Sequence, residues 1–567
     1  MHFSFDGSRK PYYTATTHPA SMVREKKEGF MVRKGTAVLS LALFLFAGTG
    51  LFAGGAPEAP DEQVVRIALS DEPGSLDLHA DTTTVSLDVA QAVYENLIRL
   101  DEDMELQPWL AEEFEQLDEV TYRFWLREGV EFHSGNPFNA EAVKAHIDRM
   151  NDPDDPGLAA AYLDWIEEVV VIDEYTVDII ASQPYGPGLA FLALPHAAIH
   201  DTQSAEEQGD LFGVSPSGTG PFVIDEWRRG TSIELSANEN YWGGVPAVAG
   251  LEFRIIPEAG TRTMALQTGE VDVTTQLPPE AVETLQGADG VDVIIVPEPR
   301  YIRWQVNVSH PYLSDINVRR ALTHAIDYPM IIDAILEEYG RPLHGYGPRG
   351  QFGFLELPYE YDPDEADRLL RESGWEPNAR GIYEKDGEEL QLDIITGNKM
   401  ARELELFEAM QSEFRDFGID IGIEQIEGAQ IYPEIVRYMQ MGVPPGWDEA
   451  GEEAREGVDF ALLTMDGGAR TGEVNVAFEN SFRSDGIRNP TTWYNHRFDE
   501  LMDIAVSGAP EEERLEAYYE AQRILHEELP SIHLWQPTWA MATADYIDGF
   551  ILHPAGVWYY EDIEIVR

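Results

Sequence analysis

The side chains best suited to chemistry in this chain are hydroxyls, carboxylates and aromatic rings. Three consecutive threonines, Thr82, Thr83 and Thr84, follow the first predicted strand, and their hydroxyls can both donate and accept hydrogen bonds. The same residues also suit an ordinary loop that caps a helix. The spacing alone therefore leaves a ligand contact and a helix cap as alternatives.

Catalytic and metal-binding motifs are absent from the sequence. It has no Gly-rich phosphate loop, no HExxH helix and no G-x-S-x-G elbow. The 14 histidines lack metal-ligand spacing, and there is no cysteine. With 103 acidic residues, paired carboxylates arise by chance and do not identify a glycosidase. We expect no enzymatic activity, cofactor or metal, and an extracellular hydrolase is the alternative from a different class.

The composition is that of a large acidic globular protein. The 567 residues carry a formal net charge of −64, and 43% of them are hydrophobic, which suffices for several cores. So acidic a surface repels nucleic acid and anionic membranes, and it repels itself unless salt screens it. We expect no nucleic-acid partner and interpret the charge as an adaptation to a saline environment outside the cell.

An apolar run near the N-terminus predicts export. Residues 36–53 follow the basic pair Arg33 and Lys34 and precede a stretch of small residues, which is the order of a secretory signal. The apolar core at residues 37–47, broken only by Ser40, is about half the length of a membrane span. We therefore assign residues 1–56 to a leader with a signal peptide and expect a periplasmic or secreted protein. An uncleaved membrane anchor is the alternative.

Apolar spacing predicts a mixed α/β chain. We expect strands at 64–69, 122–126, 169–172, 176–180, 222–224, 233–237, 251–256, 293–296, 390–395, 419–425 and 532–535. Helices are expected at 86–100, after Asn139, and at 318–326, 364–373, 402–417 and 511–528. The order strand, helix, strand over 390–425 indicates a βαβ unit on a parallel sheet.

Several phrases occur in the order found in one known family. They are Ser75–Leu78, Tyr94–Leu97, Leu106–Ala111, Tyr122–Gly135, Phe138–Val143, Gly218–Phe222, Asn238–Trp242, Arg262–Asp272, Val318–Asp327 and Tyr361–Leu370. Together they resemble the family 5 extracellular solute-binding proteins of ABC importers, the dipeptide, oligopeptide and nickel-binding type. The resemblance covers residues 62–567.

The resemblance implies a two-lobed periplasmic-binding-protein type II fold of the α/β class, with an extra subdomain in the N-terminal lobe. On that topology lobe I comprises residues 61–97, 218–300 and 531–567, the subdomain 98–217, and lobe II 301–530. The implied function is capture of a peptide-like solute between hinged lobes. The implied partners are this solute and the permease subunits of an ABC transporter, with the binding protein itself a monomer.

The resemblance also suggests ligand contacts. The threonines at 82–84 match the position that lines the family's cleft. Tyr301 and Trp304 lie just past the predicted crossing into lobe II, where an aromatic ring can stack on a ligand; core packing is the alternative. Trp447 and Trp493 are further aromatic candidates.

One family motif is incomplete here. Peptide binders carry an Asp in a W-x-x-D-x-x-x-P segment that pairs with the peptide's amino terminus. The corresponding stretch, residues 463–472, contains Asp466 but lacks the Trp and the Pro. Asp466 suits an ammonium group, whereas Arg470 suits a carboxylate. The departure leaves an oligosaccharide open as the alternative ligand to a peptide.

Overall fold

The computed structural model describes residues 63–566, except 102–103, 156, 398–399, 401, 427–459, 469–471, 485, 487–488, 551–552 and 554. The predicted leader at 1–56 and the candidate residues Trp447 and Arg470 lie outside the described residues. Everything described belongs to one unit, Pro60–Arg567.

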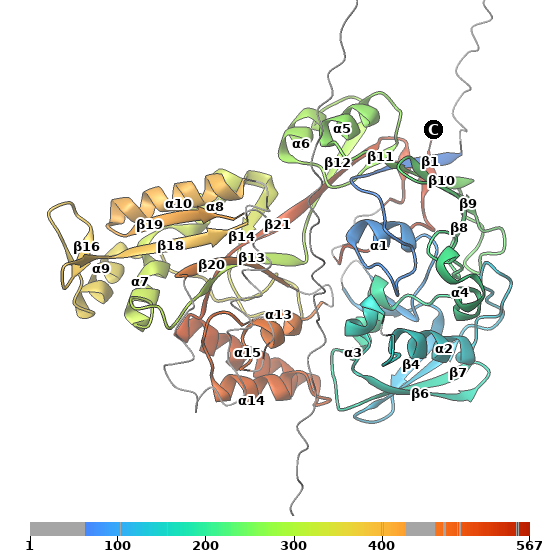
Figure 1. Ribbon diagram of the computed structural model, residues 1–567, viewed down its shortest axis with the longest axis horizontal. Coiled ribbons are helices and arrows are strands. Elements are labelled where there is room, and N and C mark those ends of the chain that lie inside the picture. The colour runs from blue at the N-terminus through green and yellow to red at the C-terminus, as the bar shows by residue number, and fades with distance from the viewer. Residues whose placement is uncertain are drawn as a thin grey trace, which may run out of the picture. The chain divides into compact units, whose positions relative to one another are not determined.

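The central sheet depends on strand β21 (Ser531–Ala544), which pairs with different strands along its two halves. Residues 531–537 pair with β13 (Arg300–Val306) and β14 (Gly340–Pro342). Residues 538–544 pair with β12 (Val291–Pro297) and β11 (Val273–Thr274). Figure 1 shows β21 passing from one group of strands to the other. The other connection between the two groups is the short link from β12 to β13.

The lobe I part of the sheet combines parallel and antiparallel pairs. β1 (Val64–Leu69), at the bounds that the sequence predicted, runs parallel to β10 (Gly250–Ile255) and to β11. β9 (Ser232–Ala237) and β8 (Phe222–Arg228) continue the sheet in antiparallel order. Helices α5 (Ala259–Gln267) and α6 (Pro279–Leu285) follow β10 and β11 along the chain.

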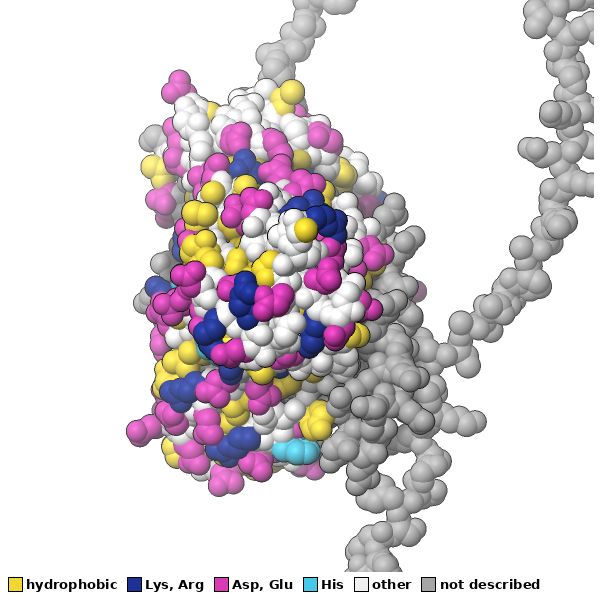
Figure 2. All heavy atoms as spheres, turned by 90° about the vertical axis from the view of Figure 1, so that its left-hand side faces the viewer, with side chains coloured by type: hydrophobic (Ala, Val, Ile, Leu, Met, Phe, Trp, Pro, Cys, Tyr) yellow, Lys and Arg dark blue, Asp and Glu magenta, His cyan; other side chains and the backbone are white. Residues whose placement is uncertain are grey.

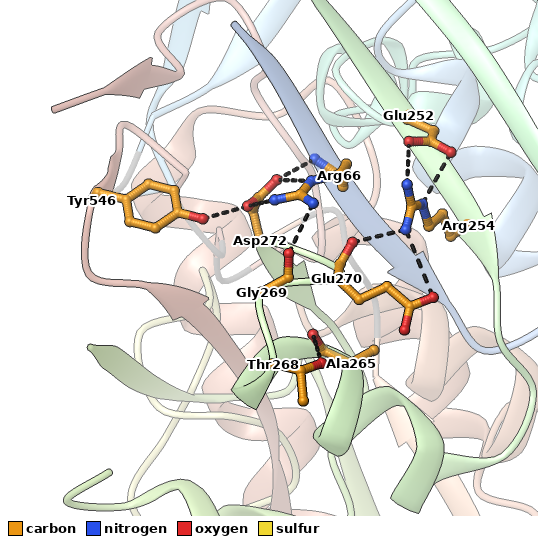
Figure 3. Close-up of polar contacts among 9 residues, drawn as sticks. All are labelled: Arg66, Glu252, Arg254, Ala265, Thr268, Gly269, Glu270, Asp272 and Tyr546. Carbon is orange, nitrogen blue, oxygen red and sulfur yellow. Dashed lines mark hydrogen bonds and ion pairs between the residues drawn. The ribbon is translucent and has the colours of Figure 1, made fainter. Parts of the chain in front are cut away.

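An ion pair fixes the turn between α5 and β11 (Figure 3). Asp272 is almost fully buried and accepts hydrogen bonds from the backbone N–H and the guanidinium of Arg66, at 2.6–2.9 Å, and from the hydroxyl of Tyr546. Arg66 also donates to the carbonyl of Gly269 at 2.8 Å. Because Arg66 lies on β1 and Tyr546 follows β21, Asp272 links β11 to both neighbouring strands.

A four-stranded antiparallel sheet lies between β1 and β8 in the sequence. Its order is β4 (Ala111–Gln116), β5 (Thr121–Leu126), β7 (Thr176–Ala181) and β6 (Ile166–Asp173), which confirms the predicted hairpin. The predicted helix after Asn139 is α2 (Ala140–Met150), and the Asn139 side chain accepts from the backbone N–H of Ala142 at 3.1 Å.

The predicted helix over 86–100 is wrong in its second half. α1 (Thr84–Ala90) ends early, and residues 98–100 form β2 (Ile98–Leu100). The carbonyls of Ala92 and Val93 accept from the backbone N–H groups of Phe222 and Gly220, so tertiary pairing replaces the helical hydrogen bonds.

The lobe II sheet follows the order β19 (Asp420–Gln425), β18 (Gln391–Thr396), β20 (Leu462–Gly468), β13. β18 is parallel to both β19 and β20, and α10 (Glu403–Phe417) joins β18 to β19, as the sequence predicted. Helices α7 (Ile316–Ala325), α8 (Tyr328–Leu336), α9 (Pro363–Glu372) and α10 share a core with the buried face of β13 that carries Ile302 and Trp304.

The opposite face of β13 carries Tyr301, which packs in a separate core with α13 (Asn475–Ser481), α14 (His496–Ala505) and α15 (Glu511–Glu528). Figure 1 shows these three helices as one group.

The remaining elements are short: β3 (Leu106–Pro108), η1 (Leu158–Tyr162), α3 (Gly188–Leu192), η2 (Pro195–Ala197), α4 (Thr202–Gln208), η3 (Gly209–Leu211), η4 (Glu337–Tyr339), β15 (Glu376–Pro377), β16 (Tyr383–Lys385), β17 (Glu388–Glu389), β22 (Ile547–Asp548) and β23 (Glu564–Ile565).

The surface carries its acidic charge in a dispersed form. Figure 2 shows Asp and Glu side chains spread over the visible face, with Arg and Lys side chains between them. Among the residues described, no helix combines the length and the apolar character needed to cross a membrane.

Candidate ligand-binding cleft

A cavity of about 760 Å³ lies where strands of both lobes end. In lobe I it is reached by Ala259 after β10 and by Gln276 after β11; in lobe II it is reached by Met400 and Arg402 after β18. Ligands of open α/β sheets bind in the crevice outside the carboxyl ends of the strands. Its walls are formed by Thr84, Ala259, Gln276–Glu280, Glu298, Arg300, Tyr339, Met400, Arg402, Glu405, Trp535 and Pro537–Ala540.

The crossings between the lobes contribute Glu298 and Arg300. Nε and Nη2 of Arg300 lie 2.7 and 2.5 Å from one oxygen of Glu298, whose side chain is 7% exposed. Nη1 of Arg300 also lies 3.7 Å from Asp466 at the end of β20. Arg300 therefore serves mainly as the counterion of a buried carboxylate and only weakly neutralises the half-exposed Asp466.

Arg402 lies at the start of α10 and reaches across to lobe I. Its Nη2 lies 3.0 Å from Oε1 of Glu283 on α6, and its Nη1 lies 3.5 Å from Glu337 and 3.1 Å from the carbonyl of Ile335. The two carboxylates are more than half exposed, so each pair is weak, and a ligand carboxylate can compete for the guanidinium.

The cleft also holds carboxylates that the described residues leave unpaired. Glu280 on α6 and Glu405 on α10 are exposed, line the cavity, and form no ion pair or side-chain hydrogen bond within the described part of the chain. One lies on each lobe. The cavity therefore presents negative charge ready for a cationic group, together with guanidinium groups that are already partly neutralised.

Two cavity-lining residues that are not glycine adopt a left-handed backbone. Gln276 has φ of 54°, and Arg402 has φ of 56°. Such conformations cost about 1–3 kcal/mol each and persist where the surroundings impose them, often at functional sites. Gln276 lies two residues after β11, and Arg402 is the N-cap of α10, in the segment that follows β18, so both left-handed residues lie beyond the carboxyl end of a strand, where the cavity is.

The structure brings one of the predicted threonines to the cavity. Thr84, the first residue of α1, lines it together with Trp539 of β21. Thr83 occupies the N-cap position of α1, but its side chain makes no capping hydrogen bond to the backbone and instead donates to the hydroxyl of Ser86 at 3.0 Å. Thr82 is half-buried and does not line the cavity.

The predicted aromatic contacts that are described lie in hydrophobic cores instead of the cavity. Trp304 is fully buried against Phe407 and Tyr328, and Tyr301 is 1% exposed in the core with α13 to α15. Trp493 is buried and donates its indole N–H to Glu528 at 2.6 Å. For Tyr301 and Trp304 this is the core packing that the sequence left open as the alternative.

Asp466 lies at the rim, tied to the cavity through Arg300. Sequence reasoning did not find Gln276, Glu280, Arg402 or Glu405. A usable signal existed, because the predicted strand at 390–395 and helix from 402 placed Arg402 at the carboxyl end of a parallel strand.

Comparison with known proteins gives a family-level match. The model of "Bacterial extracellular solute-binding proteins, family 5 Middle" matches residues 105–489. The glutathione-binding protein GsiB of Escherichia coli (strain K12) is 27% identical over 542 residues, covering 94% of this chain and 99% of that protein.

Solved structures share the fold. HbpA2 from Haemophilus parasuis aligns with a TM-score of 0.76 at 22% identity, over 89% of this chain and 100% of that one. A dipeptide-binding protein from Pseudoalteromonas sp. SM9913, in complex with Met-Leu, aligns with a TM-score of 0.68 at 23% identity, over 89% and 100% of the two chains.

Proposed function

Because the chain belongs to the family 5 bacterial extracellular solute-binding proteins, we propose that it captures a short peptide in the cleft between its lobes. The fold is the predicted two-lobed type II fold, and the general role is that of the substrate-binding component of an ABC importer. The observation that carries the peptide assignment is the mixed charge of the cavity.

The amino end of a peptide fits the carboxylates of the cleft. Glu280 and Glu405 face the cavity without a cationic partner among the described residues, and Asp466 has only a 3.7 Å contact with Arg300. An ammonium group placed among them gains charge-assisted hydrogen bonds. Asp466 thus keeps the role expected from the sequence, as one of several carboxylates.

The carboxyl end fits Arg402. Its guanidinium presents a fork of donors suited to a carboxylate, and its present partners are exposed side chains whose ion pairs contribute about 0–1 kcal/mol. Thr84 supplies a hydroxyl on the opposite lobe. GsiB and the Pseudoalteromonas protein, whose names specify glutathione and a dipeptide, are consistent with this ligand class.

The finer organisation of the protein follows the same proposal. We retain lobe I as 61–97, 218–300 and 531–567, the subdomain as 98–217 and lobe II as 301–530, with a signal peptide within residues 1–56. The protein then works as a monomer outside the cytoplasm and delivers its ligand to permease subunits.

A thermal-shift screen against di- to pentapeptides and oligosaccharides, run at high salt, tests the assignment because a ligand stabilises the state that it binds. Peptides should raise the melting temperature. Arg402→Gln and Glu405→Gln should each weaken binding about tenfold or more, as expected for charge-assisted contacts.

Glu408→Gln is the matched control. It lies one turn from Glu405 on α10, is exposed and does not line the cavity. If this variant lost as much affinity as Glu405→Gln, the carboxylate assignment would fail. If no peptide shifted the melting temperature, the peptide assignment itself would fail.

The oligosaccharide alternative rests on the aromatic residues of the same cavity. Tyr339 and Trp539 line it, from η4 and β21 respectively, and an aromatic ring suits the apolar face of a sugar. Shifts with oligosaccharides that vanish in Trp539→Ala but persist in Arg402→Gln would favour this alternative.

A further inference from the structure

A second cavity, of about 680 Å³, adjoins the strands that join the lobes. Its arginines, Arg341 and Arg349, are different from those of the cleft, Arg300 and Arg402. It is lined by Pro297–Pro299 from one crossing and Gln536 from the other, and by the segment from Arg341 to Phe354. The two cavities have one lining residue in common, Glu298, whose carboxylate is engaged by Arg300.

Arg341 is exceptional among the described arginines. It projects into this cavity from β14, is exposed, and forms no ion pair and no side-chain hydrogen bond with any described residue. Every other described arginine has at least one such partner, including the buried Arg303, which donates to Ser481. In a chain with 103 acidic and 39 basic residues, a guanidinium without a carboxylate is unexpected.

Further donors line the same cavity. Arg349 is paired with Glu356 at 2.8 Å, but both side chains are more than half exposed, so the pair is weak and an incoming anion can compete. His344, which lies between these two arginines in the sequence, is half-buried and also lines the cavity. The lining thus offers two guanidinium groups and an imidazole against one carboxylate that is already paired.

Four prolines restrict the backbone of the cavity wall. Pro297, Pro299, Pro342 and Pro348 line it, and proline fixes the backbone dihedral φ near −65°. β14 pairs with β21 so that Arg341 lies opposite Gln536. The prolines and this pairing restrict the backbone that carries Arg341, so less backbone freedom is lost when a ligand binds.

We propose that this cavity is a second ligand site, which binds a small oxyanion, a carboxylate or a phosphate, through Arg341 and Arg349. The guanidinium fork matches the planar or tetrahedral oxygens of such groups and can bind them through two hydrogen bonds at once. Through Pro297–Pro299 and Gln536 the anion would contact both connections between the lobes. The proposal does not depend on which solute occupies the cleft.

Calorimetric titration of the full-length protein with inorganic phosphate and with succinate, at constant ionic strength, tests the site. Saturable binding of either probe is expected, and Arg341→Gln should weaken it about tenfold or more. Arg349→Gln should weaken it less, because Glu356 already competes for that side chain. The probe that binds distinguishes a phosphate from a carboxylate ligand.

Two control variants make the result decisive. Arg415→Gln removes an exposed arginine, paired with Asp420, that does not line the cavity, and it should leave the affinity unchanged. Arg402→Gln alters the cleft and should also retain anion binding. The proposal is overturned if neither probe binds, if Arg341→Gln binds as wild type, or if Arg402→Gln alone abolishes binding. If no peptide raised the melting temperature in the thermal-shift screen, the peptide assignment of the cleft would fail, but anion binding at this second cavity would still stand.

Discussion

Arg402 and Glu283 form an ion pair across the rim of the cleft, with Nη2 of Arg402 3.0 Å from Oε1 of Glu283. One residue precedes α10 in lobe II and the other lies on α6 in lobe I. The pair therefore links the lobes and occupies a guanidinium that the proposed peptide carboxylate needs.

Removing this competitor should strengthen peptide binding. In Glu283→Gln the guanidinium of Arg402 loses a partner worth about 0–1 kcal/mol, so affinity should rise by up to about fivefold in a calorimetric titration. Glu408→Gln serves as the control for the lost charge. A fall in affinity would show instead that Glu283 contributes to holding the lobes together around the ligand.

The turn before β11 should depend strongly on Asp272 (Figure 3). Asp272→Asn leaves the mostly buried guanidinium of Arg66 without its carboxylate, which should lower the free energy of unfolding by about 3–5 kcal/mol. Glu270→Gln, two residues away, changes a carboxylate that is 62% exposed and 3.8 Å from Arg254. This substitution should lower the free energy of unfolding by less than about 1 kcal/mol. Urea denaturation of both variants measures the two losses. Equal losses of stability in the two variants would contradict the structural role given to Asp272.

Glu95 should make stability fall as the pH rises. Burial raises the pKa of this carboxyl to about 7 from its usual 4.5, although Trp109, Thr219, Tyr241 and Trp242 all donate hydrogen bonds to it. Between these values the folded state retains a proton that the unfolded chain releases. The protonated Glu95 therefore contributes on the order of 3 kcal/mol to the free energy of unfolding. This contribution is fully present below pH 4.5 and is lost as the pH rises through about 7.

The measurement compares wild type with Glu95→Gln by denaturation at several pH values. The variant has a constant penalty because its amide N–H groups face donors, but it cannot titrate. The stability difference between the two proteins should therefore change through the window from pH 4.5 to 7. A difference independent of pH would contradict the shifted pKa.

Arg303 should be replaceable without loss of stability. Its side chain is 1% exposed, donates to Ser481, and has Nε and Nη1 without hydrogen-bond partners in the described chain. Its guanidinium also lies 5.0 Å from the ring of Tyr301 and 5.4 Å from that of Phe482, contacts that an apolar side chain of similar length can replace by packing, while the cost of burying the charge disappears. Arg303→Met should therefore melt at or above the wild-type temperature in calorimetry. A large decrease would reveal a structural role for the guanidinium.

Salt should stabilise the whole protein. With a net charge of −64, like charges repel across the surface, and the screening length falls from about 30 Å at 0.01 M salt to about 3 Å at 1 M. The melting temperature should rise steeply with sodium chloride and show little response to a neutral solute at matched osmolality. Equal effects of both solutes would attribute the stabilisation to hydration instead of charge.

The sequence predicted the local elements well where the periodicity was strong. The unit β18, α10, β19 was correct in type and order because the helix and strands each carry one clear apolar face. Residues 91–97 were assigned to a helix because their apolar spacing continues that of α1. Their conformation is set by backbone pairing with Gly220 and Phe222, more than a hundred residues away, which spacing cannot reveal.

The cleft was harder to predict for the same physical reason. Its charged residues come from α6, α10 and the crossing at Glu298–Arg300, and each segment alone resembles an ordinary surface. The aromatic candidates on β13 alternate between two buried faces, so a strand with cores on both sides hides Tyr301 and Trp304 from solvent. Whether an aromatic ring faces a core or a cavity depends on helices that pack from elsewhere in the chain.

The double pairing of β21 has a consequence for the order of assembly. Synthesis proceeds from the N-terminus, so β1 and β10 can pair, and β18 can join β19, before residues 531–544 exist. Both sheets then await the same late strand, and the first half of β21 completes one while the second half completes the other. A nascent chain stopped before Ser531 would expose an unpaired edge in each lobe at once, so shielding by a chaperone should matter most at that stage.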